Sequence, residues 1–513
     1  MTSLRLRSAR FCSLLLIVLG SADLLPVFGQ HSPGGSSEPL PGADRVAARV
    51  RDVYASCDSG SRRHDLPIGV FDSGTGGLAV LEAILRLDAF DNRQHTPLRT
   101  GDRLPDFQSE RFVFLADQVN MPYGNYPSLG KVRFLRELVL KDAEFLLSAE
   151  YWPAPAAPAP RRNRRPVKAI VIACNTATAY GYRDIAGVLA QAGVDLPVIG
   201  VIGAGAQAAL DGLGPTTEGT IGVLATAGTV ASGAYPAAIQ TLARQHGASH
   251  RIEVIQQGSV GLAGAIDEAR EFVVRVSDGH APRPDYRGPA SGHPQAPLDC
   301  RALPRYGFDF SAGKMLFSGS PAEPSCLQLN AVDNYVAYEL VSLLETLRAR
   351  GTNRPLRAVI LGCTHFPYVA DAIRAHWKRL YGHQEDGRYV YRHLMMEDVR
   401  LIDPAHYVAV ELYSRLARQR MLTESPGPDS GSSRGEFYIT VPNPLDTSVK
   451  LNLDVWFAHE YKYGRDDGLS QPEVRTVPLV PERVDAGTRA RLARTVPCAW
   501  GLLREFAQPR APD

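Results

Sequence analysis

Short apolar runs alternate with amphipathic segments along most of this chain. The runs at 169–173 and 357–362 are rich in β-branched residues and have the length of strands buried on both faces of a parallel sheet. Helical periodicity marks segments such as 131–150 and 330–350. Strands that alternate with helices in this way predict an α/β fold with mostly parallel sheets.

Both of these apolar runs end on a cysteine. Cys174 follows the first run and Cys363 follows the second, and each has a threonine one or two positions later. Sites in open α/β sheets lie beyond the carboxyl ends of the strands, where both thiols are therefore expected. A single cysteine in this setting is most often a buried core thiol. Two in matched settings indicate an internal duplication, with one thiol from each half facing the other across a cleft.

The composition sets bounds on the architecture and the partners. The chain has 513 residues, of which 44% are hydrophobic and 21% charged, an ordinary globular composition that allows two or three domains. A formal net charge of +2 indicates neither nucleic acid nor an anionic membrane surface as a partner. The arginine-rich run at 161–165 is interpreted as a solvated loop.

The amino-terminal segment differs in kind from the rest. A basic region with three arginines precedes an apolar run over residues 11–19, and small residues follow at 20–22. This order is typical of a secretory signal peptide, and the apolar run is too short to span a membrane. We therefore assign residues 1–29 to a signal peptide, whose cleavage after Ala22 or Gly29 the sequence does not decide. The prediction is a periplasmic or secreted protein with no stable membrane anchor after cleavage.

Export changes the interpretation of the cysteines. Of the seven, Cys12 would leave with the signal peptide, and two belong to the matched motifs. The remaining four are Cys57, Cys300, Cys326 and Cys498, and an oxidising compartment would allow two disulfides among them in three connectivities. A bridge between Cys300 and Cys326 is favoured because both flank one inserted loop. The two motif thiols are expected to stay unpaired across a substrate-sized gap.

These motifs resemble the glutamate racemase branch of the aspartate/glutamate racemase superfamily. Beside the cysteine motifs, the segment 68–78, Ile-Gly-Val-Phe-Asp-Ser-Gly-Thr-Gly-Gly-Leu, is similar to that family's opening strand and substrate loop. The segment 114–117, with the Pro-Tyr-Gly turn at 122–124, is similar to its second signature. Aspartate and hydantoin racemases usually carry glutamate after the second Cys-Thr, so His365 favours the glutamate branch.

The resemblance covers roughly residues 66–440 and implies a fold. It implies two pseudo-symmetric domains, each a mostly parallel sheet flanked by helices, with the active site in the cleft between them. The predicted boundaries are 30–65 for a linker or N-terminal arm, 66–201 for domain 1 (completed by 397–441), 202–396 for domain 2 with an exposed insertion at about 277–324, and 442–513 for a C-terminal extension without a recognised pattern.

Racemisation at an α-carbon needs one group to remove a proton from one face and another to deliver a proton to the opposite face. Thiols suit both roles near neutral pH, provided that their usual pKa of about 8.5 is lowered. The resemblance implies Cys174 acting on the D enantiomer and Cys363 acting on the L enantiomer. It also implies Asp72 as the catalytic partner of Cys174 and His365 as that of Cys363.

The resemblance further implies a set of substrate-binding residues drawn from the same motifs: Asp72, Ser73, Tyr123, Gly124, Asn175, Thr176, Thr364 and His365. Asp267 is an auxiliary candidate in a segment only loosely similar to the family, and an ordinary surface carboxylate is the alternative. No lysine lies in a recognisable pyridoxal-phosphate setting, and the Cys-x-His spacing lacks a second ligand pair. We therefore predict no cofactor and no metal.

The favoured hypothesis is a cofactor-independent isomerase that interconverts L- and D-glutamate. The alternatives are an aspartate or broad-specificity racemase of the same superfamily, and a non-catalytic periplasmic amino-acid-binding protein. The presence of both cysteines with Asp72 and His365 argues against the binding protein. Family members are typically cytoplasmic suppliers of D-glutamate for cell-wall peptidoglycan, so the cytoplasm is the default location if the amino-terminal segment is not cleaved. A small amino acid is the expected partner, and a homodimer is left open.

Overall fold

The computed structural model describes residues 39–56, 63–213, 218–245, 247, 251–274, 281–423, 434–453, 455–468 and 471–508. The predicted signal peptide, Cys12 and Cys57 lie outside these residues. Within the described ranges, no helix is long and apolar enough to cross a membrane.

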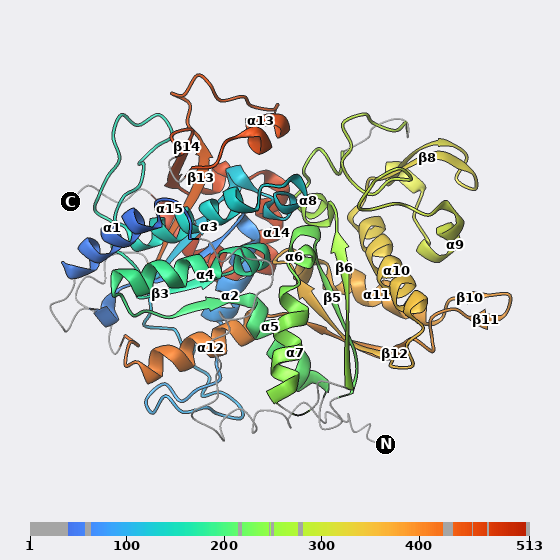
Figure 1. Cartoon of the computed structure of the whole chain (residues 1–513), viewed down its shortest axis with the longest axis horizontal. Helices are drawn as coiled ribbons and strands as arrows, with labels where there is room; N and C mark the ends of the chain where they lie inside the picture. Colours follow the sequence, from blue (N-terminus) through green and yellow to red (C-terminus); the bar gives the residue numbers. More distant parts are fainter. Residues whose placement is uncertain are drawn as a thin grey trace, which may run out of the picture.

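A six-stranded sheet forms the core of the first domain (Figure 1). The strand order is β14–β13–β2–β1–β3–β4, and all neighbouring strands are parallel except β13 and β14. The strands are β1 (Ile68–Asp72), β2 (Phe112–Ala116), β3 (Ala169–Ile172), β4 (Val198–Gly200), β13 (Gly435–Pro442) and β14 (Val474–Pro478). Every residue of β1, β2 and β3 is buried, as expected of strands covered on both faces.

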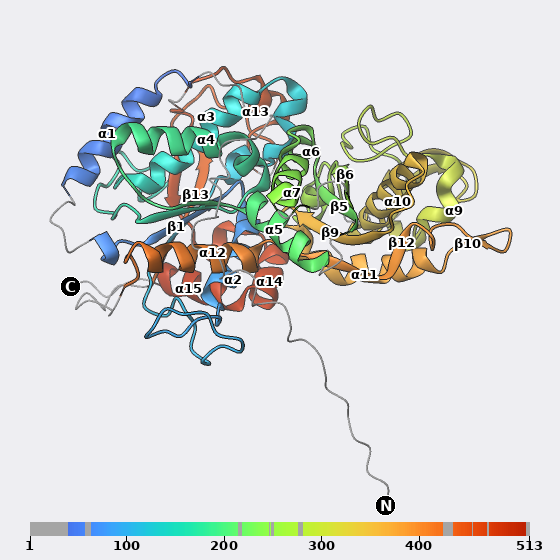
Figure 2. The same ribbon diagram turned by 60° about the horizontal axis from the view of Figure 1, so that its bottom comes forward.

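Two helical layers cover this sheet (Figure 2). One layer contains α1 (Ala43–Ala55), α3 (Val132–Leu147) and α4 (Asn175–Ala192). The other contains α2 (Leu78–Leu85), α12 (Ala405–Arg418) and α15 (Pro497–Ala507). Part of the segment predicted as a linker or arm is thus helix α1, which packs against α4 through its apolar face.

The second domain is built on a four-stranded parallel sheet in the order β12–β9–β5–β6. Its strands are β5 (Gly219–Thr226), β6 (Ile252–Ser259), β9 (Leu356–Gly362) and β12 (Met395–Ile402). One face packs on α5 (Val201–Leu213) and α7 (Ala234–Gln245), and the other on α8 (Leu262–Ile266), α10 (Val332–Arg350) and α11 (Ala370–Tyr381). The short helix α6 (Ala227–Ala231) follows β5 at its carboxyl end. Because β12 belongs to this sheet, the chain returns to the first domain a few residues later than the predicted boundary.

The predicted insertion contains regular structure. It holds helix α9 (Leu303–Tyr306) and an antiparallel hairpin of β7 (Met315–Gly319) and β8 (Pro324–Leu329). Met315, Leu327 and Leu329 are buried in the same cluster as α10. A second small hairpin, β10 (Gln384–Glu385) and β11 (Arg388–Tyr389), lies between α11 and β12.

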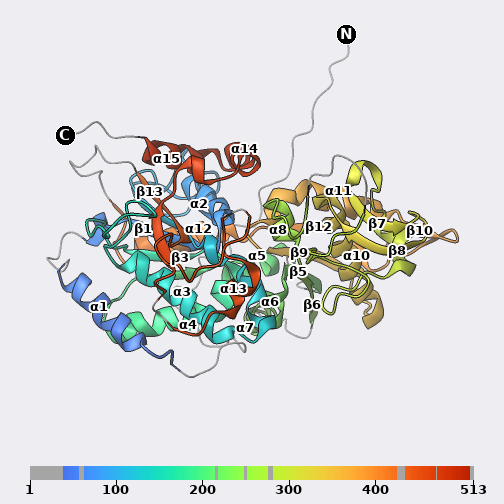
Figure 3. The same ribbon diagram turned by 90° about the horizontal axis from the view of Figure 1, so that it is seen from above.

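The C-terminal extension is part of the first domain. Its strand β14 pairs with β13, and the short helix α13 (His459–Gly464) lies between these two strands in the chain. Two further helices follow: α14 (Ala486–Thr495) packs on α15, and α15 packs on α2 (Figure 3). The backbone N–H of Ala499 donates to the buried Glu82 carboxylate on α2, 2.9 Å away, and fixes the start of α15.

The β3 strand begins with a buried ion pair. The Lys168 side chain is 0% exposed, and its Nζ lies 2.7 Å from Oε2 of Glu110, which is 2% exposed. Lys168 also donates to the Met421 carbonyl and the Thr423 hydroxyl. This lysine therefore joins β3 to the loop before β2 and to the segment after α12.

Replacing Lys168 with methionine is expected to lower the free energy of unfolding by about 3–5 kcal/mol, because Glu110 is left as a buried charge without its cation. Chemical denaturation of the two proteins measures this difference. The exposed Lys450→Met serves as a matched control and should stay within about 0.5 kcal/mol of the wild type. The double variant Lys168→Met/Glu110→Gln should recover much of the loss. Equal stability of Lys168→Met and the wild type would contradict this account.

Candidate active site

A cavity of about 1010 Å³ lies between the two domains, at the carboxyl ends of β1, β3 and β9. The structure brings together every residue predicted for the site along its wall: Asp72, Ser73, Tyr123, Gly124, Cys174, Asn175, Thr176, Asp267, Cys363, Thr364 and His365. Cys174 and Cys363 come from different domains and are both buried and unpaired. The arrangement of one thiol per domain in one cavity is the one that the duplicated motif predicts.

Cys174 lies between strand β3 and helix α4. It is the N-cap residue of α4, and its Sγ accepts from the backbone N–H of Ala177 at 3.5 Å. Its thiol also donates to the Ser73 hydroxyl, 3.7 Å away. Burial raises the pKa of Cys174 above its usual value, and the charge of Asp72 adds to this effect, against the helix N–H group that lowers it. Cys174 is therefore held as a thiol, the form that can donate a proton.

Asp72 ends strand β1 and contacts both domains. Its Oδ2 accepts from the backbone N–H of Gly77 at 2.7 Å and from the hydroxyl of Thr364, in the second domain, at 3.3 Å. Its Oδ1 is buried and has no hydrogen-bond partner among the described residues. Burial raises the pKa of Asp72, and the charge of His365 opposes the increase. One carboxylate oxygen in the cavity wall is thus available for a donor from a bound molecule.

A chain of contacts leads away from Cys363. Its Sγ lies 3.7 Å from Nδ1 of His365, and Nε2 of His365 lies 3.0 Å from Oδ2 of Asp267. The Asp267 side chain is only 9% exposed, so Asp267 is not a surface carboxylate. Burial opposes the charged form of His365, but the Asp267 carboxylate outweighs it and raises the pKa of His365 well above its usual range. An imidazolium therefore lies beside the second thiol.

Tyr123 lines the cavity, and its hydroxyl belongs to a buried polar network. Its hydroxyl donates to the Asp117 carboxylate and lies 2.6 Å from Oδ2 of Asp142, and both acidic side chains are fully buried. A buried polar network thus fixes the turn at 122–124 on the side away from the cavity, and the Tyr123 hydroxyl is part of that network. A Cβ atom at Gly124 would lie 2.7 Å from Cβ of Thr226, so only glycine allows the turn to approach strand β5 this closely.

Hydroxyl groups join the two domains beside Cys174. The Thr176 hydroxyl lies 3.0 Å from that of Thr226 and 2.9 Å from that of Thr229. Asn175 accepts from the Tyr235 hydroxyl at 2.6 Å through its Oδ1. The sequence motifs did not identify Thr229 or Tyr235 as site residues, although the segment 219–232 repeats the order of a strand followed by a hydroxyl-rich loop.

Gly76 marks another close approach between the domains. A Cβ atom there would lie 2.7 Å from Cε1 of His365 and 2.7 Å from Oγ1 of Thr364. No side chain larger than hydrogen fits between the substrate loop of the first domain and the cysteine motif of the second. The closed position of the cleft therefore depends on this glycine.

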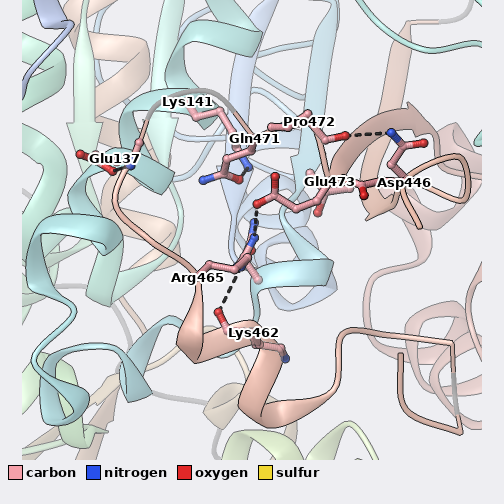
Figure 4. Close-up of polar contacts among 12 residues, drawn as sticks. Glu137, Lys141, Asp446, Lys462, Arg465, Gln471, Pro472 and Glu473 are labelled. Carbon is pink, nitrogen blue, oxygen red and sulfur yellow. Dashed lines mark hydrogen bonds and ion pairs between the residues drawn. The ribbon is translucent and has the colours of Figure 1, made fainter. Parts of the chain in front are cut away.

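The C-terminal extension supplies a wall of the cavity that the sequence analysis did not foresee. The residues concerned are Asn452, Trp456, Lys462, Arg483, Val484, Asp485 and Thr488. The segment is fixed in place by polar contacts (Figure 4). Arg465 lies 3.1 Å from Glu473, and the Gly468 N–H donates to Glu137 on α3. Lys462 donates to the Met121 carbonyl at 2.6 Å. The first domain, the second domain and the C-terminal extension all line the cleft. No sequence motif indicates the part played by the extension.

The predicted disulfide between Cys300 and Cys326 is wrong. Both are free in the structure, as is Cys498. Cys326 lies on β8 opposite Ser318, whereas the Cys300 Sγ lies 3.6 Å from the Ser291 hydroxyl. Flanking the same loop does not bring these thiols together, because the hairpin register places a serine opposite Cys326. Among the described residues, no group of three or more histidine, cysteine or acidic side chains is arranged to hold a metal ion.

Residues 148–281 match the family described as Asp/Glu/Hydantoin racemase. The resemblance to the racemase family is confirmed. The chain is 34% identical over 217 residues to the glutamate racemase of Limosilactobacillus fermentum, covering 41% of this chain and 63% of that protein. It is 38% identical over 169 residues to the glutamate racemase of Levilactobacillus brevis, covering 33% and 45%. The chain thus spans less than two thirds of the length of these curated relatives.

Two of the solved structures that match this chain are those of glutamate racemases. Isoform RacE1 from Bacillus anthracis is 22% identical, with a TM-score of 0.40, and the alignment covers 72% of this chain and 86% of that one. The enzyme from Francisella tularensis, solved in complex with D-glutamate, is 20% identical with a TM-score of 0.39, and the alignment covers 79% and 96%.

The contact between Asp267 and His365 generates a prediction about charge. Asp267→Asn should lower the pKa of His365, because it removes the charge that favours the imidazolium while burial continues to oppose it. The imidazolium, and the stability it contributes below its folded-state pKa, should then be lost at a lower pH. NMR titration of the His365 ring protons measures the shift, with the distant His293 as an internal reference. An unchanged His365 titration would show that Asp267 does not set its charge.

Proposed function

We propose that the protein is a cofactor-independent glutamate racemase in which Cys174 and Cys363 transfer the protons. The observation that carries the proposal is the placement of two buried thiols, one from each domain, in the wall of one cavity. Each thiol has its own acid–base neighbour, Asp72 near Cys174 and His365 beside Cys363. Racemisation needs such a pair, because the departing and arriving protons use opposite faces of the α-carbon.

Each thiol begins the reaction in a particular protonation state. In the L-to-D direction, the Cys363 thiolate removes the α-proton, so that the Cα–H bond breaks and an S–H bond forms. The Cys174 thiol then donates its proton to the opposite face, so that its S–H bond breaks and a new Cα–H bond forms. The imidazolium of His365 lies beside the sulfur that begins as the thiolate, and the raised pKa of Cys174 favours the starting thiol. The reverse reaction begins from the opposite pair of protonation states.

Substrate binding follows from the remaining groups in the wall. The unpartnered Oδ1 of Asp72 suits the ammonium group of an amino acid. The hydroxyls of Ser73 and Thr364 and the backbone N–H groups of the glycine-rich substrate loop suit its α-carboxylate. Glutamate is the proposed side-chain choice because the similar proteins are named glutamate racemases and because a histidine, His365, follows the second cysteine motif.

The proposed physiological product is D-glutamate, a component of peptidoglycan. A periplasmic or secreted location remains a prediction that rests on the amino-terminal segment alone. A homodimer likewise remains a prediction.

Replacing either thiol should abolish the reaction. Cys174→Ala and Cys363→Ala are each expected to lower kcat by at least about 10²–10⁴-fold, because each removes one of the two proton-transfer groups. Incubation with L-glutamate in D2O, followed by NMR loss of the α-proton signal and by D-glutamate formation, measures the effect. The exposed Cys498→Ala is the matched control and should keep wild-type activity.

Other outcomes would redirect or overturn the proposal. Turnover of L-aspartate in place of L-glutamate would make the protein an aspartate-directed racemase. Clear binding of an amino acid without α-proton exchange would indicate a binding protein and would overturn the proposal of a racemase.

Gly76→Ala should damage catalysis by opening the cleft. Its added methyl group would meet His365 and Thr364, and a displacement of about 1 Å at the reacting groups is expected to lower kcat about 10²-fold. Gly187→Ala, on an open face of α4, is the control and should leave kcat unchanged. Steady-state kinetics with L-glutamate, together with the melting temperature, separates loss of geometry from loss of folding. Full activity in Gly76→Ala would show that the domains need not approach as closely as they do here.

A further inference from the structure

Arg491, in the C-terminal extension, reaches into the second domain. Its Nη2 lies 2.5 Å from Oδ1 of Asp267, and its Nη1 donates to the carbonyl oxygen of Ile266. The guanidinium carbon lies 5.4 Å from the centre of the Tyr368 ring. The Arg491 side chain is only 13% exposed, so its position is fixed by these three contacts and not by solvent.

The two carboxylate oxygens of Asp267 contact different residues. Oδ1 contacts Arg491 and Oδ2 contacts His365, which in turn contacts Cys363. Four side chains therefore form one continuous chain of polar contacts that ends at a thiol. Three of them belong to the second domain, and only Arg491 belongs to the extension.

Arg491 also connects the two domains. Its helix α14 packs on α15, which packs on α2 and β13 of the first domain. Leu492, the next residue, is buried in the same cluster as α2 and α15. The contact with Asp267 therefore ties the helical layer of the first domain to the loop that follows α8 in the second.

The contact between Arg491 and Asp267 could be only a structural ion pair. The charge of Asp267, however, also affects His365 in the site. Burial opposes the ionised form of Asp267, and the charges of His365 and Arg491 together hold its pKa below the usual value. Arg491 contacts Asp267 directly and does not contact His365. Its loss would therefore destabilise the carboxylate more than it would relieve the imidazolium, and the Asp267–His365 pair would shift towards its neutral form.

We propose that Arg491 is a positioning residue for the Cys363 half of the reaction, acting through Asp267 and His365 from a segment outside the racemase motifs. This proposal rests on the proposed function. It makes the C-terminal extension a working part of the active site. Cys174 does not belong to this chain of contacts and meets the charge of His365 only indirectly, through Asp72, so the effect of Arg491 falls mainly on the Cys363 transfer.

Because Arg491 acts mainly on the Cys363 transfer, kinetic isotope effects in the two directions test the proposal. α-Deuterated L-glutamate loses its deuteron to Cys363, whereas α-deuterated D-glutamate loses it to Cys174. In Arg491→Gln, the Cys363 step becomes more rate-limiting, so the isotope effect on kcat/KM should rise with the L substrate and fall towards unity with the D substrate. The values of kcat/KM themselves must fall together in both directions, because the equilibrium constant is fixed. A fall of up to about 10²-fold is expected, because a small misplacement of an active-site group can cost that much.

Two further variants complete the design. Arg494→Gln removes an exposed arginine from the same helix and should change neither the rate nor the isotope effects. Arg491→Lys keeps a cation and should restore most of the rate and the wild-type isotope pattern. If Arg491→Gln lowers the melting temperature but leaves the ratio of the two isotope effects unchanged, Arg491 is only structural and the proposal is overturned.

A readout without turnover keeps the two proposals apart. In Arg491→Gln, the ¹⁵N NMR signature of the His365 imidazolium at neutral pH should weaken, whereas Arg494→Gln should preserve it. If the wild type fails to racemise glutamate but the signature weakens as expected, the proposed function fails and the influence of Arg491 on the site stands. An unchanged imidazolium signature would overturn that influence, whatever the activity.

Discussion

The charge of one buried carboxylate, Asp267, determines whether His365 beside Cys363 is charged. An ion of this kind costs several kcal/mol to remove from water, so it survives only beside groups that compensate it. Asp267 has two such groups, an imidazolium and a guanidinium, on its two oxygens. If the carboxylate were neutral, His365 would lose the interaction that keeps it charged, and the thiol beyond it would lose its nearest cation. The charge beside Cys363 thus depends on a carboxylate two side chains away.

The two halves of the cavity are complementary because their thiols have opposite surroundings. Cys174 has a carboxylate as its neighbour and a raised pKa, whereas Cys363 has an imidazolium. A symmetric pair of thiols would leave both protonated or both ionised. The pseudo-symmetry of the fold therefore stops at the side chains next to the sulfur atoms, which differ in charge.

Much of this arrangement is predictable from sequence, for a physical reason. A strand buried on both faces needs an unbroken apolar run, so 169–173 and 357–362 coincide closely with β3 and β9, and the 330–350 periodicity coincides with α10. Arg491 has no such signal, because its partner lies 224 positions earlier in the chain and nothing local marks the contact. The β7–β8 hairpin is equally hidden, since its short strands bury only a few residues among Gly, Ser and Pro. The burial of Asp267 depends on packing that its own neighbourhood in sequence does not encode.

The chain order of the first sheet has a consequence for folding. Strand β13 pairs with β2 only after the whole second domain has been made, and β14 then covers the outer edge of β13. Until residues 435–442 arrive, one side of β2 presents unpaired N–H and C=O groups, which is the usual starting point for edge-to-edge association. Such distant pairing also closes slowly, because the loop entropy must be overcome first. The segment from β13 onward thus supplies one wall of the candidate site and also ends the period during which this sheet can pair with a neighbouring molecule.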